Sequence, residues 1–198
     1  MTRAHFTKSF TQQLPIPEEG IAAATEVMRS GRLHRYNTAG SEASETMELE
    51  REFAQWQGQK FCLAVASGGQ AMQIAMRAAG VVPGDLVLTN SFTLAPVPGS
   101  IAAVGGKPVL VEITADLVLD LDDLAAKAQA TGARYLLLSH MRGHLCDMDR
   151  LMQIATDHHI TIIEDCAHTM GARWNGKLSG SFGLAGCFST QTYKHMNS

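Results

Sequence analysis

The stretch Ile-Ile-Glu-Asp-Cys-Ala-His occupies residues 162–168, and it is followed, after a glycine-rich segment, by Gly-Cys-Phe-Ser at residues 186–189 and then by Lys194. The first stretch is a short apolar run that ends in an acid, as expected of a buried strand that closes with a functional carboxylate. Open α/β sheets place their ligands at the carboxyl ends of such strands. This order of acid, hydroxyl and lysine therefore predicts a ligand site at one edge of a sheet.

These three residue types are what pyridoxal phosphate (PLP) requires of a protein. An anion keeps the pyridine nitrogen of the cofactor protonated, hydrogen-bond donors hold its phosphate, and an amine reacts with its aldehyde. Asp165 is the candidate anion, Ser189 a candidate donor and Lys194 the candidate amine. Taken singly, Asp165 is equally compatible with a turn cap, and Lys194 with an ordinary surface lysine. Their order along the chain is what favours the cofactor site.

A second motif, Ser-Gly-Gly-Gln-Ala at residues 67–71, lies where an apolar stretch gives way to a predicted helix. Small residues at such a point allow a phosphate to approach the free backbone N–H groups of the first helical turn, where the helix dipole also favours an anion. The motif differs from the Gly-x-Gly-x-x-Gly pattern of dinucleotide sites. By itself it is equally compatible with a plain tight turn.

The hydrophobic pattern predicts the fold class. From residue 61 onward, short and near-continuous apolar runs alternate with helical segments, which indicates a sheet covered on both faces. We therefore predict an α/β three-layer αβα sandwich with a mostly parallel, mixed sheet. The expected strands are residues 61–66, 86–89, 108–113, 134–139, 160–165 and 186–190, and the expected helices are 18–30, 44–57, 70–79, 120–130 and 148–158. Residues 1–58 form an N-terminal helical segment in this interpretation, and 59–198 an incomplete cofactor-binding domain.

Composition excludes several classes of protein. A hydrophobic fraction of 45% over 198 residues suits a globular domain with a buried core. The formal net charge of −3 gives no basic excess that would favour nucleic acid or an anionic membrane. No apolar run approaches the roughly 20 residues that cross a bilayer, and residues 1–5 lead into polar sequence rather than a signal-peptide core. We expect a cytoplasmic protein without nucleic-acid or membrane partners.

A metal site is the competing interpretation of the acidic strand end, because imidazole, carboxylate and thiolate groups occur near it. The candidate ligands are His140, His144, Asp165, Cys166 and His168. They form no compact metal-binding motif on a helix, since Gly143 places the first two histidines in a loop. The 4 cysteines are scattered without a Cys-x-x-Cys pair, so we expect buried free thiols rather than disulfides or ligands. We predict no metal.

With these residues in place, the stretch from about residue 31 to 198 resembles the DegT/DnrJ/StrS family of sugar aminotransferases, which are PLP enzymes of fold type I. Residues 67–71 look like the Ser-Gly-Thr-x-Ala phosphate cup of that family. Further landmarks follow in the family's order at residues 83–87, 91–93, 105–109, 140–143, 147–149, 164–168 and 186–194. A sustained, collinear series of motifs is a specific signal.

The resemblance implies a role for each candidate residue. Asp165 pairs with the pyridine nitrogen, His168 contacts the phenolic oxygen, and Lys194 attaches covalently to the aldehyde as the catalytic residue. The implied cofactor-binding residues are Gly68, Gly69, Gln70, Leu94, Asp165, His168, Ser189 and Lys194. Of these, Ser189 and the turn at residues 68–70 would hold the phosphate.

Two positions depart from the family pattern. Leu94 stands where the family usually has an aromatic residue stacked on the pyridine ring, so aliphatic contact replaces stacking there. Gly69 replaces the usual threonine of the cup, which removes one phosphate donor. The chain also stops at Ser198, soon after the lysine, whereas such enzymes continue for about as many residues again and build a C-terminal small domain. We therefore expect a chain truncated at its C-terminus, without the small domain.

The activity implied by the resemblance is transamination of a keto-sugar, nucleotide-linked in many members, with glutamate or glutamine as amino donor, in a homodimer. A PLP-dependent sugar dehydratase of the same family is an alternative, because that branch has histidine in place of the lysine and His195 follows Lys194. A truncated, non-catalytic binding protein is another. On the truncation reading, the isolated chain would be mobile over Tyr193–Ser198 and bind PLP weakly.

Overall fold

The computed structural model describes residues 7, 15–192 and 194–196. Its centre is a sheet of five strands in the order β2-β1-β3-β4-β7, and every pairing between them is parallel. The strands are β1 (Leu86–Asn90), β2 (Lys107–Val111), β3 (Tyr135–Ser139), β4 (Thr161–Asp165) and β7 (Ala185–Cys187). The carboxyl ends of β3 and β4 therefore lie side by side, with Ser139 in register with Asp165.

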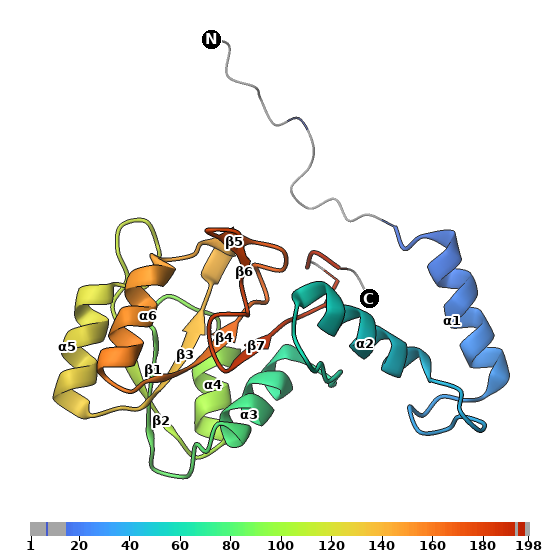
Figure 1. Cartoon of the computed structure of the whole chain (residues 1–198), viewed down its shortest axis with the longest axis horizontal. Helices are drawn as coiled ribbons and strands as arrows, with labels where there is room; N and C mark the ends of the chain where they lie inside the picture. The colour runs from blue at the N-terminus through green and yellow to red at the C-terminus, as the bar shows by residue number, and fades with distance from the viewer. Residues whose placement is uncertain (1–6, 8–14, 193, 197–198) are drawn as a thin grey trace.

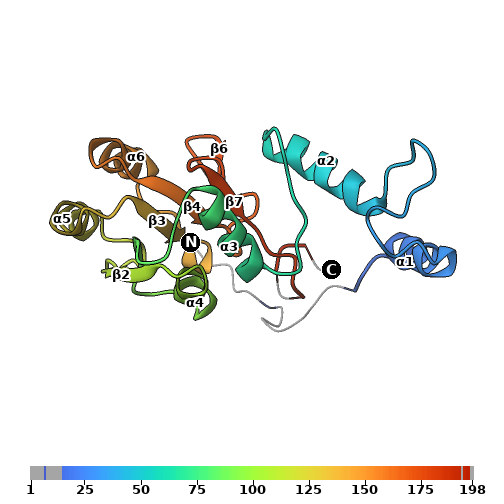
Figure 2. The ribbon, with the colours of Figure 1, turned by 90° about the horizontal axis from the view of Figure 1, so that it is seen from below.

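Helices cover both faces of this sheet and produce three layers (Figure 1; Figure 2). One face carries α3 (Gly68–Ala78) and α4 (Pro96–Ala103), and the other carries α5 (Leu121–Thr131) and α6 (Met148–Asp157). Successive strand residues supply the two cores in turn: Leu136 packs among α5 and α6 side chains, and Leu137 among those of α3 and α4. This alternation is why the strands are apolar throughout, and it confirms the predicted αβα sandwich.

Local sequence signals set the helix ends. The carboxylate of Asp120 accepts hydrogen bonds from the N–H groups of Asp122 and Asp123, at 2.9 and 3.2 Å, and so caps the start of α5. Gly132 ends α5 in the left-handed conformation, with a φ of 66°. These two signals predicted the span of α5 to within one residue at each end.

Two further helices lie to one side of the sandwich (Figure 1; Figure 2). Helix α1 (Glu18–Ser30) has no buried residue, and its Met28 side chain is 65% exposed. Helix α2 (Glu45–Gln57) is capped by Ser44 and approaches the sandwich through its C-terminal end. Residues 1–6 and 8–14 of the expected N-terminal segment lie outside the described residues, and the boundary at residue 58 stays a prediction. No helix in the described part of the chain is long and apolar enough to cross a membrane.

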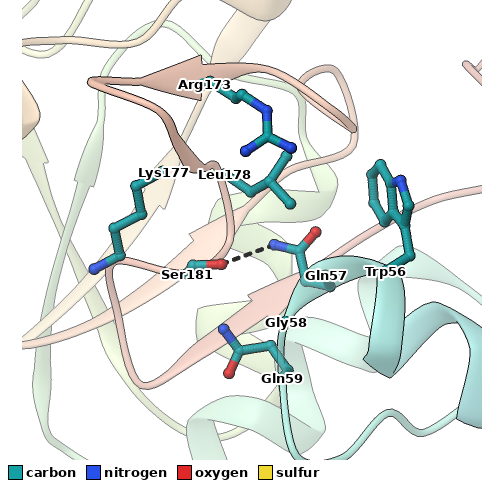
Figure 3. Close-up of a pocket in the computed structure, with 8 residues that line it drawn as sticks. All are labelled: Trp56, Gln57, Gly58, Gln59, Arg173, Lys177, Leu178 and Ser181. Carbon is teal, nitrogen blue, oxygen red and sulfur yellow. Dashed lines mark hydrogen bonds between the residues drawn. The ribbon is translucent and has the colours of Figure 1, made fainter.

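Gln57 ties the end of α2 to the loop that precedes β7 (Figure 3). Its Nε2 donates to the carbonyl oxygen of Ser179 at 2.7 Å and to Oγ of Ser181 at 3.0 Å. Next to it, the Phe53 and Phe188 rings meet edge to face with centroids 5.0 Å apart. A shallow cleft of about 430 Å³ opens beside this tether, between α2 and the hairpin of β5 (Arg173–Trp174) and β6 (Lys177–Leu178).

The predicted strand at residues 61–66 is wrong. The chain there is irregular, and Phe61 and Leu63 are 78% and 57% exposed. Its backbone N–H groups bond to side chains instead of a neighbouring strand: Ala64 donates to Glu50 at 2.8 Å, and Ala66 to Gln70 at 2.9 Å. Apolar residues alone do not make a strand when no ladder partner is available.

A buried carboxylate organises the return of the chain from β4 to β7. Glu164 is fully buried, and its Oε1 accepts the N–H groups of Phe182 and Gly183 at 2.7 and 2.8 Å. Its Oε2 accepts the N–H of Gly180 at 2.8 Å and lies 3.0 Å from Nε2 of His140. Burial disfavours the charged form of Glu164, but the hydrogen bonds from His140 and the backbone outweigh it, so the pKa of Glu164 lies below its ordinary value.

We expect Glu164→Gln to lower the free energy of unfolding of the intact protein by about 3 kcal/mol at neutral pH, because the amide NH₂ cannot accept the backbone N–H groups that the carboxylate binds. A carboxylate with a lowered folded-state pKa contributes stability above its unfolded value, here 4.5, and loses it as the pH falls through the folded value. The variant should lack this loss. Urea unfolding followed by circular dichroism at neutral pH and below pH 4.5 measures both effects.

The matched control is Glu112→Gln, because Glu112 is an exposed glutamate. It should change the urea midpoint by little at either pH. Equal midpoints for the Glu164 and Glu112 variants would show that the 180–183 loop does not depend on the buried carboxylate.

Candidate active site

Asp165 ends β4 at the carboxyl edge of the sheet, where it was predicted to lie. Its Oδ1 accepts the N–H of Ala167 at 3.1 Å, and its Oδ2 accepts the hydroxyl of Ser139 at 3.1 Å. The residue is half-buried, in contrast to the fully buried Glu164 before it. Adjacent strand residues face opposite ways, so the structural carboxylate is directed to the 180–183 loop and its neighbour is available to a ligand.

A cavity of about 320 Å³ lies near this carboxylate, which interacts electrostatically with Lys194 and His168 of the cavity lining. It is lined by Arg142, Ala167, His168, Lys194 and His195. The residues come from the loops that follow β3, β4 and β7, so the sheet brings together segments that are far apart in the sequence. Lys194 and His168, which were predicted to share a site, line the same cavity.

The electrostatics of the cavity favour an uncharged amine at Lys194. Partial burial lowers the pKa of Lys194, and the nearby Arg142 guanidinium lowers it further, whereas Asp165 acts in the opposite direction. The net pKa lies below the ordinary value for lysine. An amine with a lowered pKa is nucleophilic at a lower pH, as imine formation requires.

The imidazole of His168 is held in one orientation and kept neutral. Its Nδ1 accepts the N–H of Arg142 at 3.3 Å, which leaves the ring proton on Nε2 when the ring is neutral. Burial lowers the pKa of His168, and the positive charges of Lys194 and Arg142 lower it further against the attraction of Asp165. The ring is therefore able to donate a hydrogen bond from Nε2 to an oxygen acceptor.

The predicted phosphate cup is assembled from two distant segments. A Cβ placed on Gly68 would lie 3.7 Å from Cβ of Ser189, so the start of α3 meets the segment after β7. Within the described part of the chain, the N–H groups of Gly68 and Gly69 donate no hydrogen bond. A helix N-terminus with free N–H groups and an adjacent hydroxyl is suited to an anion.

For Gln70 and Leu94, the structure gives less direct support for a contact with the cofactor. The N–H of Gln70 donates to Oγ of Ser67 at 3.1 Å, and Oε1 of Gln70 accepts from Ala66, so this residue contributes to the helix cap. Leu94 lies in the loop between β1 and α4, is 46% exposed, and is not among the residues that line the Lys194 cavity. The assignment of both residues to the cofactor stays a prediction.

Two residues of the site were missed by sequence reasoning. Arg142 lines the cavity, and its backbone lies in the left-handed region at a φ of 57°. An arginine does not by itself predict that conformation. Ser139 is bonded to Asp165 through the register of β3 and β4. The sequence indicated these two residues only by their position, because each lies at or just beyond the end of a buried strand, where ligands bind in such sheets.

The residues considered for a metal are accounted for by other contacts. Among the described residues, potential ligand atoms gather within 4.8 Å only at His140, Glu164 and Cys166. The Glu164 oxygens already accept backbone N–H groups, and burial raises the pKa of the Cys166 thiol well above its ordinary value, so it stays protonated. All four cysteines are free and three are buried, as predicted. Burial also raises the pKa of Cys146 and of Cys187 to about 12.

Comparison with solved structures finds the same fold in aminotransferases. The aminotransferase from Psychrobacter cryohalolentis superimposes with a TM-score of 0.86 at 27% identity, over 95% of this chain and 46% of that one. The PLP form of the sugar aminotransferase Spr1654 from Streptococcus pneumoniae gives a TM-score of 0.80 at 28% identity, over 93% and 50%. Each neighbour is about twice the length of this chain.

Curated relatives agree with the structural neighbours. A pleiotropic regulatory protein of Geobacillus stearothermophilus is 36% identical over 83% of this chain and 42% of its own length. An L-glutamine:2-deoxy-scyllo-inosose aminotransferase of Streptomyces kanamyceticus is 32% identical over 93% and 43%. This chain thus spans less than half the length of these relatives. The model of the DegT/DnrJ/EryC1/StrS aminotransferase family matches residues 15–198, and the chain belongs to that family.

Proposed function

We propose that the protein is a PLP-dependent aminotransferase that aminates a keto-sugar, with glutamate or glutamine as the amino donor. The observation that carries this proposal is the convergence of Lys194, His168 and Asp165, since a lysine with a lowered pKa and a neutral histidine line one cavity beside a hydrogen-bonded carboxylate. Membership in the family supports the reaction class.

The residues fit the cofactor at each of its functional groups. The free N–H groups of Gly68 and Gly69, with Ser189 packed beside Gly68, suit the phosphate. Asp165 suits the protonated pyridine nitrogen, and Nε2–H of His168 suits the phenolic oxygen. When bound, PLP supplies an electron sink that stabilises the negative charge left on the substrate carbon after a proton is removed.

Lys194 has two tasks in this proposal. Its amine holds the cofactor before the amino donor arrives, and once released it carries a proton at Nζ between the substrate carbon and the cofactor. Both tasks need the neutral amine, and the lowered pKa of Lys194 increases its population. Arg142 supports this state, because its fixed positive charge disfavours a second cation in the cavity.

The relatives support the substrate class. The relative from Streptomyces kanamyceticus is described as using L-glutamine with an inosose, which is a cyclic polyhydroxy ketone. Another relative, from Caulobacter vibrioides, is a GDP-perosamine synthase, 35% identical over 72% of this chain, and its product is a nucleotide-linked amino sugar. We propose a keto-sugar acceptor of this chemistry and a homodimeric assembly, which would also cover exposed apolar side chains such as Met28 of α1.

The dehydratase alternative rests on His195, which lines the same cavity as Lys194. The Lys194 amine is favoured as the reacting group because it is partly desolvated and coupled to Asp165, whereas His195 is exposed. Identifying the residue that bonds to the cofactor separates the two functions.

We expect borohydride reduction of the PLP-loaded intact protein, followed by peptide mapping, to place the pyridoxyl group on Lys194. Lys194→Ala should abolish the label, because no other amine lines the cavity among the described residues. Lys177→Ala is the control, since Lys177 stacks on Phe182 with Nζ 4.6 Å from the ring centroid, and lines the separate cleft of Figure 3. A label recovered on Lys177 or Lys107 would contradict the assignment.

A second prediction concerns Asp165→Asn. Turnover should fall by on the order of 10² or more, while cofactor occupancy changes far less, because an amide cannot stabilise a protonated pyridine as a carboxylate does. Single-turnover kinetics with glutamate, together with the absorbance of bound cofactor, measures the two quantities separately. Transamination at the rate of the unaltered protein would show that Asp165 does not pair with the pyridine nitrogen.

A further inference from the structure

Two hydroxyl groups connect the loop after β1 to the carboxylate of Asp165. Oγ1 of Thr93 donates to Oγ of Ser139 at 2.8 Å, and Oγ of Ser139 donates to Oδ2 of Asp165 at 3.1 Å. Ser139 is only 4% exposed, and Thr93 is half-buried. The hydroxyls thus form a continuous relay, shielded from solvent at its centre.

The position of Ser139 is fixed by the sheet. It is the last residue of β3 and pairs in register with Asp165 of β4. Its backbone N–H donates to Oδ1 of Asn90 at 2.9 Å, and Asn90 is itself only 2% exposed at the end of β1. Three neighbouring strands therefore hold the Ser139 hydroxyl beside the carboxylate.

The direction of the relay follows from counting protons. A serine hydroxyl has one proton to donate, and because Oγ of Ser139 accepts from Thr93, its own proton is directed to Asp165. Each donor in such a chain polarises the next and strengthens its bond. The N–H of Ala167 binds the other carboxylate oxygen, so both oxygens of Asp165 have a fixed donor and the plane of the carboxylate is set.

The hydroxyls differ from the other groups that face Asp165. The titratable groups coupled to this carboxylate are Lys194, His168, Cys166 and Cys187. The two thiols are neutral, because burial raises the pKa of each. The charges of the lysine and histidine change with pH, and the lysine is engaged when it reacts. The hydroxyls of the relay and the N–H of Ala167 do not titrate, so they hold the carboxylate of Asp165 independently of those charges.

We propose that Thr93 and Ser139 are positioning residues that orient the carboxylate of Asp165 toward the pyridine nitrogen of the cofactor, and thereby keep that nitrogen protonated. This inference rests on the proposed pairing of Asp165 with that nitrogen. Thr93 also precedes Leu94, the predicted contact to the pyridine ring. The same short loop would then contact the ring and support the carboxylate that keeps the ring nitrogen protonated.

Nitrogen-15 NMR of the intact protein loaded with PLP labelled at the pyridine nitrogen tests the relay. The chemical shift reports the pH at which that nitrogen loses its proton. Ser139→Ala should lower this pH by about one unit, because a carboxylate that has lost its orienting hydrogen bond is no longer aligned with the pyridine nitrogen. Thr93→Val should lower it by less, and Thr93→Ser, which keeps the hydroxyl, should restore the original value. A merely structural role would not produce this ordered set of shifts.

Thr89→Val is the matched control. Oγ1 of Thr89 donates to the carbonyl oxygen of Leu137 at 2.9 Å within the same sheet, and it is not bonded to Asp165. The control should leave the pyridine titration unchanged. A second measurement needs no cofactor: the infrared carboxylate stretch of Asp165, identified by its absence in Asp165→Asn, should shift in Ser139→Ala and remain in place in Thr89→Val.

The outcomes separate the relay from the proposed function. If Asp165→Asn removes the proton from the pyridine nitrogen but Ser139→Ala and Thr93→Val leave its titration unchanged, the relay is overturned and the proposed role of Asp165 stands. If Asp165→Asn also leaves the titration unchanged, the proposed pairing is wrong and the relay falls with it. Because Thr93 is half-buried and valine matches its shape, this variant tests the relay even if Ser139→Ala folds poorly.

Discussion

The buried carboxylate of Glu164 is the interaction on which the arrangement of the site depends. Its oxygens accept three backbone N–H groups from residues 180–183 and lie beside His140, so one side chain fixes the path by which the chain returns from β4 to β7. The segments with Ser189 and Lys194 leave the sheet from β7. The residue that follows Glu164 in β4 is Asp165. The two consecutive acids thus have different roles. The oxygens of Glu164 are hydrogen-bonded within the protein, whereas the carboxylate of Asp165 is available to a ligand.

The cavity combines several positive groups with one acid. Burial lowers the pKa of both Lys194 and His168, the charge of Arg142 lowers both further, and the charge of Lys194 adds to the effect on His168. Of these groups, the guanidinium keeps its charge at all accessible pH values. The proposed chemistry needs a neutral amine and a neutral imidazole, and the lowered pKa of each of these groups favours that state.

Sequence reasoning succeeded where a pattern has one structural solution. The apolar run at residues 135–138 supplies side chains to both cores in turn, so only a sheet with two covered faces suits it. It failed where the pattern is ambiguous. Residues 61–66 have the composition of a strand but pair with no strand among the residues that the structure describes. Helix α4 was missed because its short sequence, Pro-Val-Pro-Gly-Ser-Ile-Ala-Ala, carries two prolines and a glycine, and its stability comes from packing Val97 and Ile101 into the core.

The sequence by itself determined the fold class, the order of acid, hydroxyl and lysine, and a helix whose predicted start lies within two residues of Gly68, because hydrophobic periodicity and capping act between residues that are near in the chain. Tertiary structure alone decided that Ser139 reaches Asp165, that Arg142 joins His168 and Lys194 in one cavity, and that Ser189 meets Gly68. These contacts depend on strand register and on the path of loops between strands. Such features are set by the packing of the whole sheet, and no local pattern encodes them.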